Sequence, residues 1–169
     1  MIAQMDTDSK SAQSLAAEHR QIAEDIQRLG TIATELDEVA SAYTVETWAE
    51  RAEADPSLGL LSQLVELLAS FKRGLEGHFS REEKHFPELA QRHDAAALVA
   101  SLVAEHKEAL KQMAALRGRA AELSESQAAL QTKRAEVDEF IKSLKALLGT
   151  LADHAEKEDQ VLFITDHNV

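Results

Sequence analysis

The chain has 169 residues, which suffice for one domain with a sizeable core, and its few glycines and prolines lie among many residues that favour helix. A formal net charge of −12 argues against sequence-independent binding of nucleic acid and against docking on an anionic membrane. The absence of cysteine excludes disulfides, thiolate zinc sites and iron–sulfur clusters, and no apolar run is long enough to span a membrane. With no signal-peptide pattern at residues 1–10, we expect an all-α cytoplasmic protein.

The first predicted helix begins near Ser9 or Ser11, either of which can cap its N-terminus. Residues 1–10 are then expected to form a flexible N-terminal arm. The apolar residues of this helix recur in steps of three, four and seven, at Leu15, Ile22, Ile26, Leu29, Ala33 and Leu36. Residues 44–54 are predicted to form a second, short helical piece, and Asp55-Pro56-Ser57 is the clearest turn signal in the chain.

The second long helix is predicted to follow that turn. Its apolar residues are Leu64, Leu68 (or Leu67), Phe71, Leu75, Phe86 and Leu89. Pro87 lies inside the pattern and is expected to bend or break the helix a turn earlier, near Glu83. His93-Asp94 is the predicted junction, with Asp94 as the N-cap of the third helix.

The third and fourth helices are separated by a weak connection over residues 123–127. The apolar residues of the third are Leu98, Leu102, Val103, Leu110, Met113 and Leu116. Those of the fourth are Val137, Ile141, Leu144, Leu148, Leu151 and Leu162. Four long helices with short connections predict a single domain over residues 1–169, folded as an up-down-up-down four-helix bundle.

The two halves of the chain repeat one pattern. Ala17-Glu18-His19-Arg20 in the first helix recurs as Ala104-Glu105-His106-Lys107 in the third. Leu75-x2-His78-x3-Glu82-Glu83 in the second helix recurs as Leu151-x2-His154-x3-Glu158-Asp159 in the fourth. Each half therefore carries one histidine and then one His-x3-Glu pair.

Helical periodicity places all of these polar residues on faces that otherwise carry apolar core residues. They are His19, His78, Glu82, His106, His154 and Glu158. Residues four apart stack on one helix face, so each His-x3-Glu pair can offer an imidazole and a carboxylate to the same metal or to neighbouring metals. A buried carboxylate without a partner is costly, and cations compensate for it. The pattern predicts a metal site, and imidazole with carboxylate suits iron, manganese or zinc.

With these residues the chain resembles the hemerythrin family, specifically the bacterial hemerythrin-like (HHE) domains. The resemblance covers nearly the whole chain and includes the segments from His78 to Pro87 and from His154 to Phe163. It implies two non-haem irons, with zinc or manganese as substitutes. By this likeness His19 and His78 ligate one iron, and His106 and His154 ligate the other. It also implies that Glu82 and Glu158 bridge the irons together with a solvent-derived oxygen.

The chain departs from the respiratory members of that family at Leu110, where they carry a further histidine four residues after the third-helix ligand. Each iron is then expected to keep an open position unless another residue fills it. His85 is the best candidate for an extra ligand, although an outer or exposed role is favoured because it lies seven residues after His78. Four acidic residues next to predicted ligands either orient a ligand histidine or are solvated: Glu18, Glu83, Glu105 and Asp159.

The resemblance implies a protein that binds or reacts with O2, NO or peroxide in sensing, scavenging or carriage, and the open positions make simple O2 transport doubtful. One alternative is a di-iron peroxidase or oxidase. Another is a signalling module whose metal state controls a protein partner. The sequence leaves open which metal is loaded, which small molecule is the ligand, and the oligomeric state.

Overall fold

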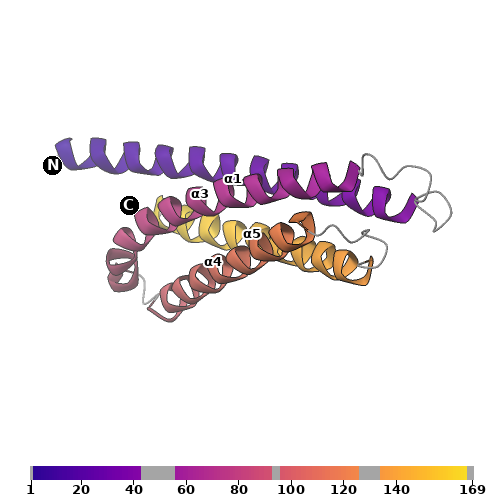
Figure 1. Ribbon diagram of the computed structural model, residues 1–169. Helices are drawn as coiled ribbons and strands as arrows, with labels where there is room; N and C mark the ends of the chain where they lie inside the picture. The colour runs from indigo at the N-terminus through magenta and orange to yellow at the C-terminus, as the bar shows by residue number, and fades with distance from the viewer. Residues whose placement is uncertain (1, 43–55, 93–95, 126–133, 167–169) are drawn as a thin grey trace.

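The computed structural model describes the backbone of residues 2–42, 56–92, 96–125 and 134–166, and side chains within residues 17–158. The described residues form four helices: α1 (Ile2–Ala42), α3 (Pro56–Arg92), α4 (Ala96–Glu125) and α5 (Arg134–Asp166). Successive helices run in opposite directions (Figure 1), so the chain folds as an up-down-up-down bundle. The predicted all-α four-helix class is confirmed.

The helices pack in a ring. Helix α1 packs against α3 and α5, and α4 packs against the same two helices. The core runs along the bundle axis and is built mainly from leucines, with Phe71, Phe79 and Phe140 as its aromatic members. Burying these apolar side chains supplies the main driving force for folding, at about 25 cal/mol for each Å² removed from water.

Most of the predicted apolar stripes face this core. All five described members of the α5 stripe are buried, and so are five members of the α3 stripe, in which Leu68 rather than Leu67 points inward. In α4 the buried face differs from the predicted stripe at two leucines. Leu98 is 40% exposed, and Ala109 is buried where Leu110 was expected, with Leu110 only partly buried.

Two helix ends differ from the prediction: the start of α1, and the end of α4, which runs to Glu125 and so into the connection predicted at residues 123–127. Helix α1 begins at Ile2 and not near Ser9 or Ser11, because residues 2–10 contain neither glycine nor proline to stop it. Of the two effects expected of Pro87, the bend is found and the break is not: α3 continues to Arg92, and the helix changes direction in its C-terminal part (Figure 1). The predicted helical piece at 44–54 and the junction at His93-Asp94 lie outside the described residues.

Pro56 is the first residue of α3, the position where a missing N–H group costs nothing and the fixed φ angle suits a helix. None of the described helices is both long enough and apolar enough to cross a membrane.

Candidate metal centre

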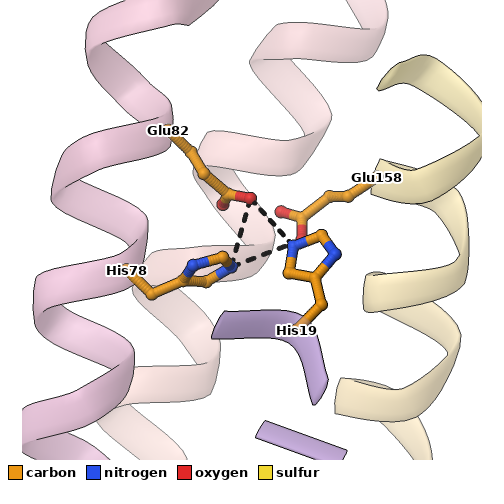
Figure 2. A group of neighbouring side chains, drawn as sticks. All are labelled: His19, His78, Glu82 and Glu158. Carbon is orange, nitrogen blue, oxygen red and sulfur yellow. Dashed lines mark hydrogen bonds and ion pairs between the residues drawn. The ribbon is translucent and has the colours of Figure 1, made fainter. Parts of the chain in front are cut away.

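All six histidine and glutamate residues predicted for the site are buried together inside the bundle. Each is at most 8% exposed: His19, His78, Glu82, His106, His154 and Glu158. Helices α1 and α4 contribute one histidine each, and α3 and α5 contribute one His-x3-Glu pair each. Figure 2 shows His19, His78, Glu82 and Glu158 converging from three helices on a common point.

The position of these side chains follows from helix geometry. On α3, His78 and Glu82 are one turn apart on the face that also carries Leu75 and Phe86, all of them buried. On α5, His154 and Glu158 continue the buried face from Leu151 in the same way. The apolar packing that holds the bundle together therefore also directs the polar side chains inward.

Four residues form the first of two overlapping clusters, here called the His19 group: His19, His78, Glu82 and Glu158. Their ligand atoms all lie within 4.8 Å of one another. The Oε1 atom of Glu82 is 3.2 Å from His19 Nε2 and 3.1 Å from His78 Nε2. The Oε2 atom of Glu158 faces the same two nitrogens, at 3.6 and 3.9 Å.

Three residues form the second cluster, the His106 group: His106, His154 and Glu158. The Oε1 atom of Glu158 is 3.0 Å from His106 Nε2 and 2.7 Å from His154 Nε2. The second oxygen of Glu82, Oε2, lies 3.6 Å from His106 Nε2. Each glutamate thus directs one oxygen toward the His19 group and the other toward the His106 group, which is the arrangement of a bridging carboxylate.

The spacing of these nitrogen and oxygen atoms suits a bound cation better than it suits hydrogen bonds between them. Among the described residues, three buried ligand-type atoms have no hydrogen-bond partner: His78 Nε2, Glu82 Oε2 and His154 Nε2. Two of them lie close to a glutamate oxygen on their own helix without the alignment of a hydrogen bond. Donors bound to one metal at about 2.1 Å and at right angles are separated by about 3 Å, which is close to these spacings.

In the metal-free protein the buried histidines and glutamates shift one another's pKa values. Burial alone would lower the pKa of His78, but Glu158, Glu82 and Glu18 outweigh it and raise the pKa from 6.5 to about 10. Burial would raise the pKa of Glu158, yet the hydrogen bond from His106 and the nearby rings of His154 and His78 keep it lowered. A proton on His78 therefore compensates the buried carboxylates, and a bound cation can replace that proton.

Three further carboxylates contact the outer nitrogens of the histidines. His78 Nδ1 donates to Glu18 at 2.9 Å, His106 Nδ1 to Glu83 at 3.1 Å, and His154 Nδ1 to Glu105 at 2.8 Å. Of the two roles considered for these three residues, orienting a histidine on a neighbouring helix is the one that the geometry favours. This holds even for Glu83, which is 41% exposed. The side chain of Asp159 lies outside the described residues.

Sequence reasoning missed Phe79. Its ring stacks on His106 with centroids 3.8 Å apart and planes inclined by 7°, and it also contacts His78 and His154. Phe79 is buried because it lies four residues after Leu75 and seven before Phe86, whose side chains are both buried. This spacing was visible in the sequence and could have revealed it.

Two other residues bear on the ligand count. Leu110 is partly buried and packs against the apolar core. His85 is exposed, so it is not placed to supply an extra ligand and the exposed role favoured for it is confirmed.

Comparison with known proteins agrees with this geometry. Residues 10–164 match the family described as the hemerythrin HHE cation-binding domain. Neither a curated protein nor a solved structure matches the chain. The family match and the buried histidine–glutamate cluster together indicate a metal-binding protein.

Proposed function

Because the chain belongs to the hemerythrin HHE cation-binding family, we propose that its six buried histidines and glutamates bind two iron ions, for which zinc or manganese can substitute. We further propose that the loaded centre binds or reacts with O2, NO or peroxide in sensing, scavenging or carriage. The observation that carries this proposal is the split of the Glu82 and Glu158 oxygens between two pairs of histidines.

In this proposal His19 and His78 hold one ion, and His106 and His154 hold the other. Glu82 and Glu158 neutralise positive charge at both positions and fix the separation of the two ions. Iron in such a site supplies a redox-active Lewis acid that can bind a small molecule. Leu110, an apolar side chain, leaves the His106 group without a third histidine and so favours open positions at both ions.

The surroundings favour a small ligand. All six side chains are at most 8% exposed, so a bulky substrate has no direct contact with them. Phe79 and Phe86 lie against the ring of His106 with centroids 3.8 and 5.8 Å away, and these rings limit the access of water on that side. A small uncharged molecule such as O2 or NO crosses an apolar layer of this kind at low cost.

The test is the metal content and optical spectrum of protein purified without oxygen, recorded before and after the addition of O2, NO or peroxide. Two irons per chain and a spectral change with at least one of these reagents are expected. Zinc alone in the purified protein, with no uptake of added iron, would contradict the iron assignment.

Peroxide turnover separates a binder from an enzyme. Stopped-flow measurement of peroxide consumption by the loaded protein should show oxidation that stops at the amount of bound iron if the protein is a sensor or carrier. Continued consumption over many cycles would favour the di-iron peroxidase alternative. E108Q is a suitable control, because Glu108 is an exposed α4 carboxylate that contacts Lys111 and Gln112 and no histidine.

A further inference from the structure

A basic residue, a glutamate and a ligand histidine form a continuous chain of contacts on the outer side of α1 and α3. His78 Nδ1 lies 2.9 Å from Glu18 Oε2. The same oxygen accepts from Arg81, whose Nε is at 3.2 Å and whose Nη2 is at 2.9 Å. Glu18 belongs to α1, whereas His78 and Arg81 belong to α3, so the chain of contacts also joins the two helices.

The second half of the protein repeats this arrangement with other residues. His154 Nδ1 lies 2.8 Å from Glu105 Oε2. Lys157 Nζ lies 3.2 Å from each oxygen of Glu105, and Ser101 donates to Oε1. Glu105 belongs to α4, and His154 and Lys157 belong to α5.

The two chains of contacts share one sequence rule. In each, the glutamate immediately precedes a predicted ligand histidine, and the basic residue follows another ligand histidine by three positions: Glu18 before His19, Glu105 before His106, Arg81 after His78, and Lys157 after His154. Glu18 and Glu105 are 24% and 27% exposed, so both are more enclosed than an ordinary surface ion pair. A geometry that recurs in both halves is unlike the scattered ion pairs that add little to stability.

We propose that Glu18 and Glu105 are positioning residues of the metal centre, held in place by Arg81 and Lys157. The inference rests on the proposed metal-binding function. A carboxylate at Nδ1 selects the tautomer with a proton on that nitrogen, which leaves the Nε2 lone pair free for the metal. It also fixes the ring so that Nε2 points to the centre. The basic residue fixes the carboxylate in turn, which lowers the entropy lost when the site is assembled.

The chain offers a matched control for this proposal. Glu108 lies three residues after Glu105 on α4 and, like it, contacts a lysine and a polar neighbour, but it contacts no histidine. E108A therefore removes the same charge from the same helix without touching the site. E18Q and E105Q are the conservative variants, because a glutamine carbonyl can still accept the hydrogen bond from Nδ1.

The test measures the affinity for zinc(II) by competition with a chelator in wild type, E18A, E105A and E108A. Loss of an outer partner of a metal ligand is expected to weaken binding by about 10- to 100-fold. E18A and E105A should show this loss, E18Q and E105Q should restore part of the affinity, and E108A should match the wild type. The melting temperature of each metal-free variant checks that the fold is intact.

Nitrogen-15 NMR of the zinc-loaded protein supplies a readout that a merely structural role would not change. E18A should alter the Nδ1–H signal of His78 and leave that of His154 in place, and E105A should do the reverse. Affinities and Nδ1–H signals equal to those of E108A would overturn the inference and leave the proposed function intact. If the wild type itself binds no zinc or iron, the proposed function fails instead.

Discussion

Glu158 has a different place in the site from Glu82, although the two occupy equivalent positions in the repeat. It belongs to both the His19 group and the His106 group, whereas Glu82 belongs to the first alone. Its Oε1 atom lies within 3.0 Å of two histidine nitrogens, and its Oε2 atom faces the other two. The contact of Glu82 with the His106 group is a single one at 3.6 Å.

This difference predicts unequal effects of two isosteric substitutions. E158Q removes a charged ligand from both groups and is expected to abolish binding of both ions. E82Q is expected to weaken binding mainly at the His19 group and to leave about one ion per chain. Metal analysis after anaerobic loading and desalting measures the ratio. Equal metal content in the two variants would contradict the asymmetry.

The raised pKa of His78 predicts how the stability of the metal-free protein depends on pH. A histidine with a raised folded pKa stabilises the fold fully below its unfolded pKa, and the contribution is lost as the pH rises through the folded pKa. The free energy of unfolding should therefore fall between pH 6.5 and about pH 10. Urea unfolding across this range measures the fall, and H78Q should reduce it. A constant free energy in the wild type would refute the prediction.

The lowered pKa of Glu158 acts at the other end of the pH scale. Its contribution is present above the ordinary glutamate pKa of 4.5 and is lost as the pH falls below that value.

The affinity for metal should change with alkaline pH in the direction opposite to the stability of the metal-free fold, because a bound ion has to displace the proton of His78. Its apparent affinity is therefore expected to rise with pH over the range in which the metal-free fold weakens.

At the scale of the helix, sequence periodicity was sufficient to place the six inward-facing site residues. On α3 and α5 the stripe is formed by large leucine and phenylalanine side chains, whose burial fixes which face points inward. On α4 the buried positions include Ala109 and Ala120, and alanines occur on every face of that helix. Small residues in a stripe leave the rotation of the helix less well determined, which explains why Leu110, expected within the core, packs against it only partly buried, beside the buried Ala109.

The outer carboxylates could not be assigned from sequence. Glu18, Glu83 and Glu105 each lie about 100° around the helix from the neighbouring ligand position, which is a boundary between core and solvent. Whether such a side chain reaches an adjacent helix depends on how the helices are spaced and rotated. Only the assembled bundle shows that His78, His106 and His154 lie within reach.

Two glycines of α3 provide a test of how closely Arg81 is packed. A Cβ atom at Gly74 meets nothing within 4 Å, whereas one at Gly77 lies 3.3 Å from Arg81 Nη1. G74A should stabilise the metal-free protein by about 0.5–1 kcal/mol through helix propensity. G77A should stabilise it less, because the guanidinium has to move away from its position beside Glu18. Urea unfolding compares them, and equal gains would show that Arg81 adjusts freely.

The C-terminal end of α1 depends on a residue from another helix. Helix α1 has no basic residue in its last turn, and Arg134 at the start of α5 donates to the carbonyl of Ala40 and to Ser41 Oγ. R134A should lower the free energy of unfolding by about 1 kcal/mol, since the carbonyl loses a charged donor near the negative end of the helix dipole. R134K should retain part of the stabilisation, because a lysine can still donate to the carbonyl of Ala40. A loss no larger than that of K142A, a substitution of an exposed α5 lysine, would argue against a capping role.

At the scale of the whole molecule, the repeat gives each half of the chain three of the six site residues. Helices α1 and α3 supply His19, His78 and Glu82, and helices α4 and α5 supply the other three. The His19 group requires Glu158 from α5 in addition to the three residues of the first half, whereas the His106 group draws all three of its residues from the second half. Ions bound in these clusters would therefore connect all four helices, and their binding energy would add to the stability of the bundle.

This coupling predicts that loading with iron(II) under anaerobic conditions raises the melting temperature. A ligand at 100 times its dissociation constant stabilises the folded state by about 2.7 kcal/mol, which corresponds to roughly 5–10 °C in a domain of this size. Differential scanning calorimetry of metal-free and loaded protein measures the shift.

The surface of the protein makes a control for this experiment essential. With a net charge of −12, the protein has many carboxylates that can attract cations weakly away from the bundle interior. E158Q should lose the thermal shift, because Glu158 contributes to both clusters, whereas E108Q should keep it although it carries the same change in charge. A shift of equal size in E158Q would place the stabilising ions on the surface, and the buried cluster would then have no part in the stabilisation.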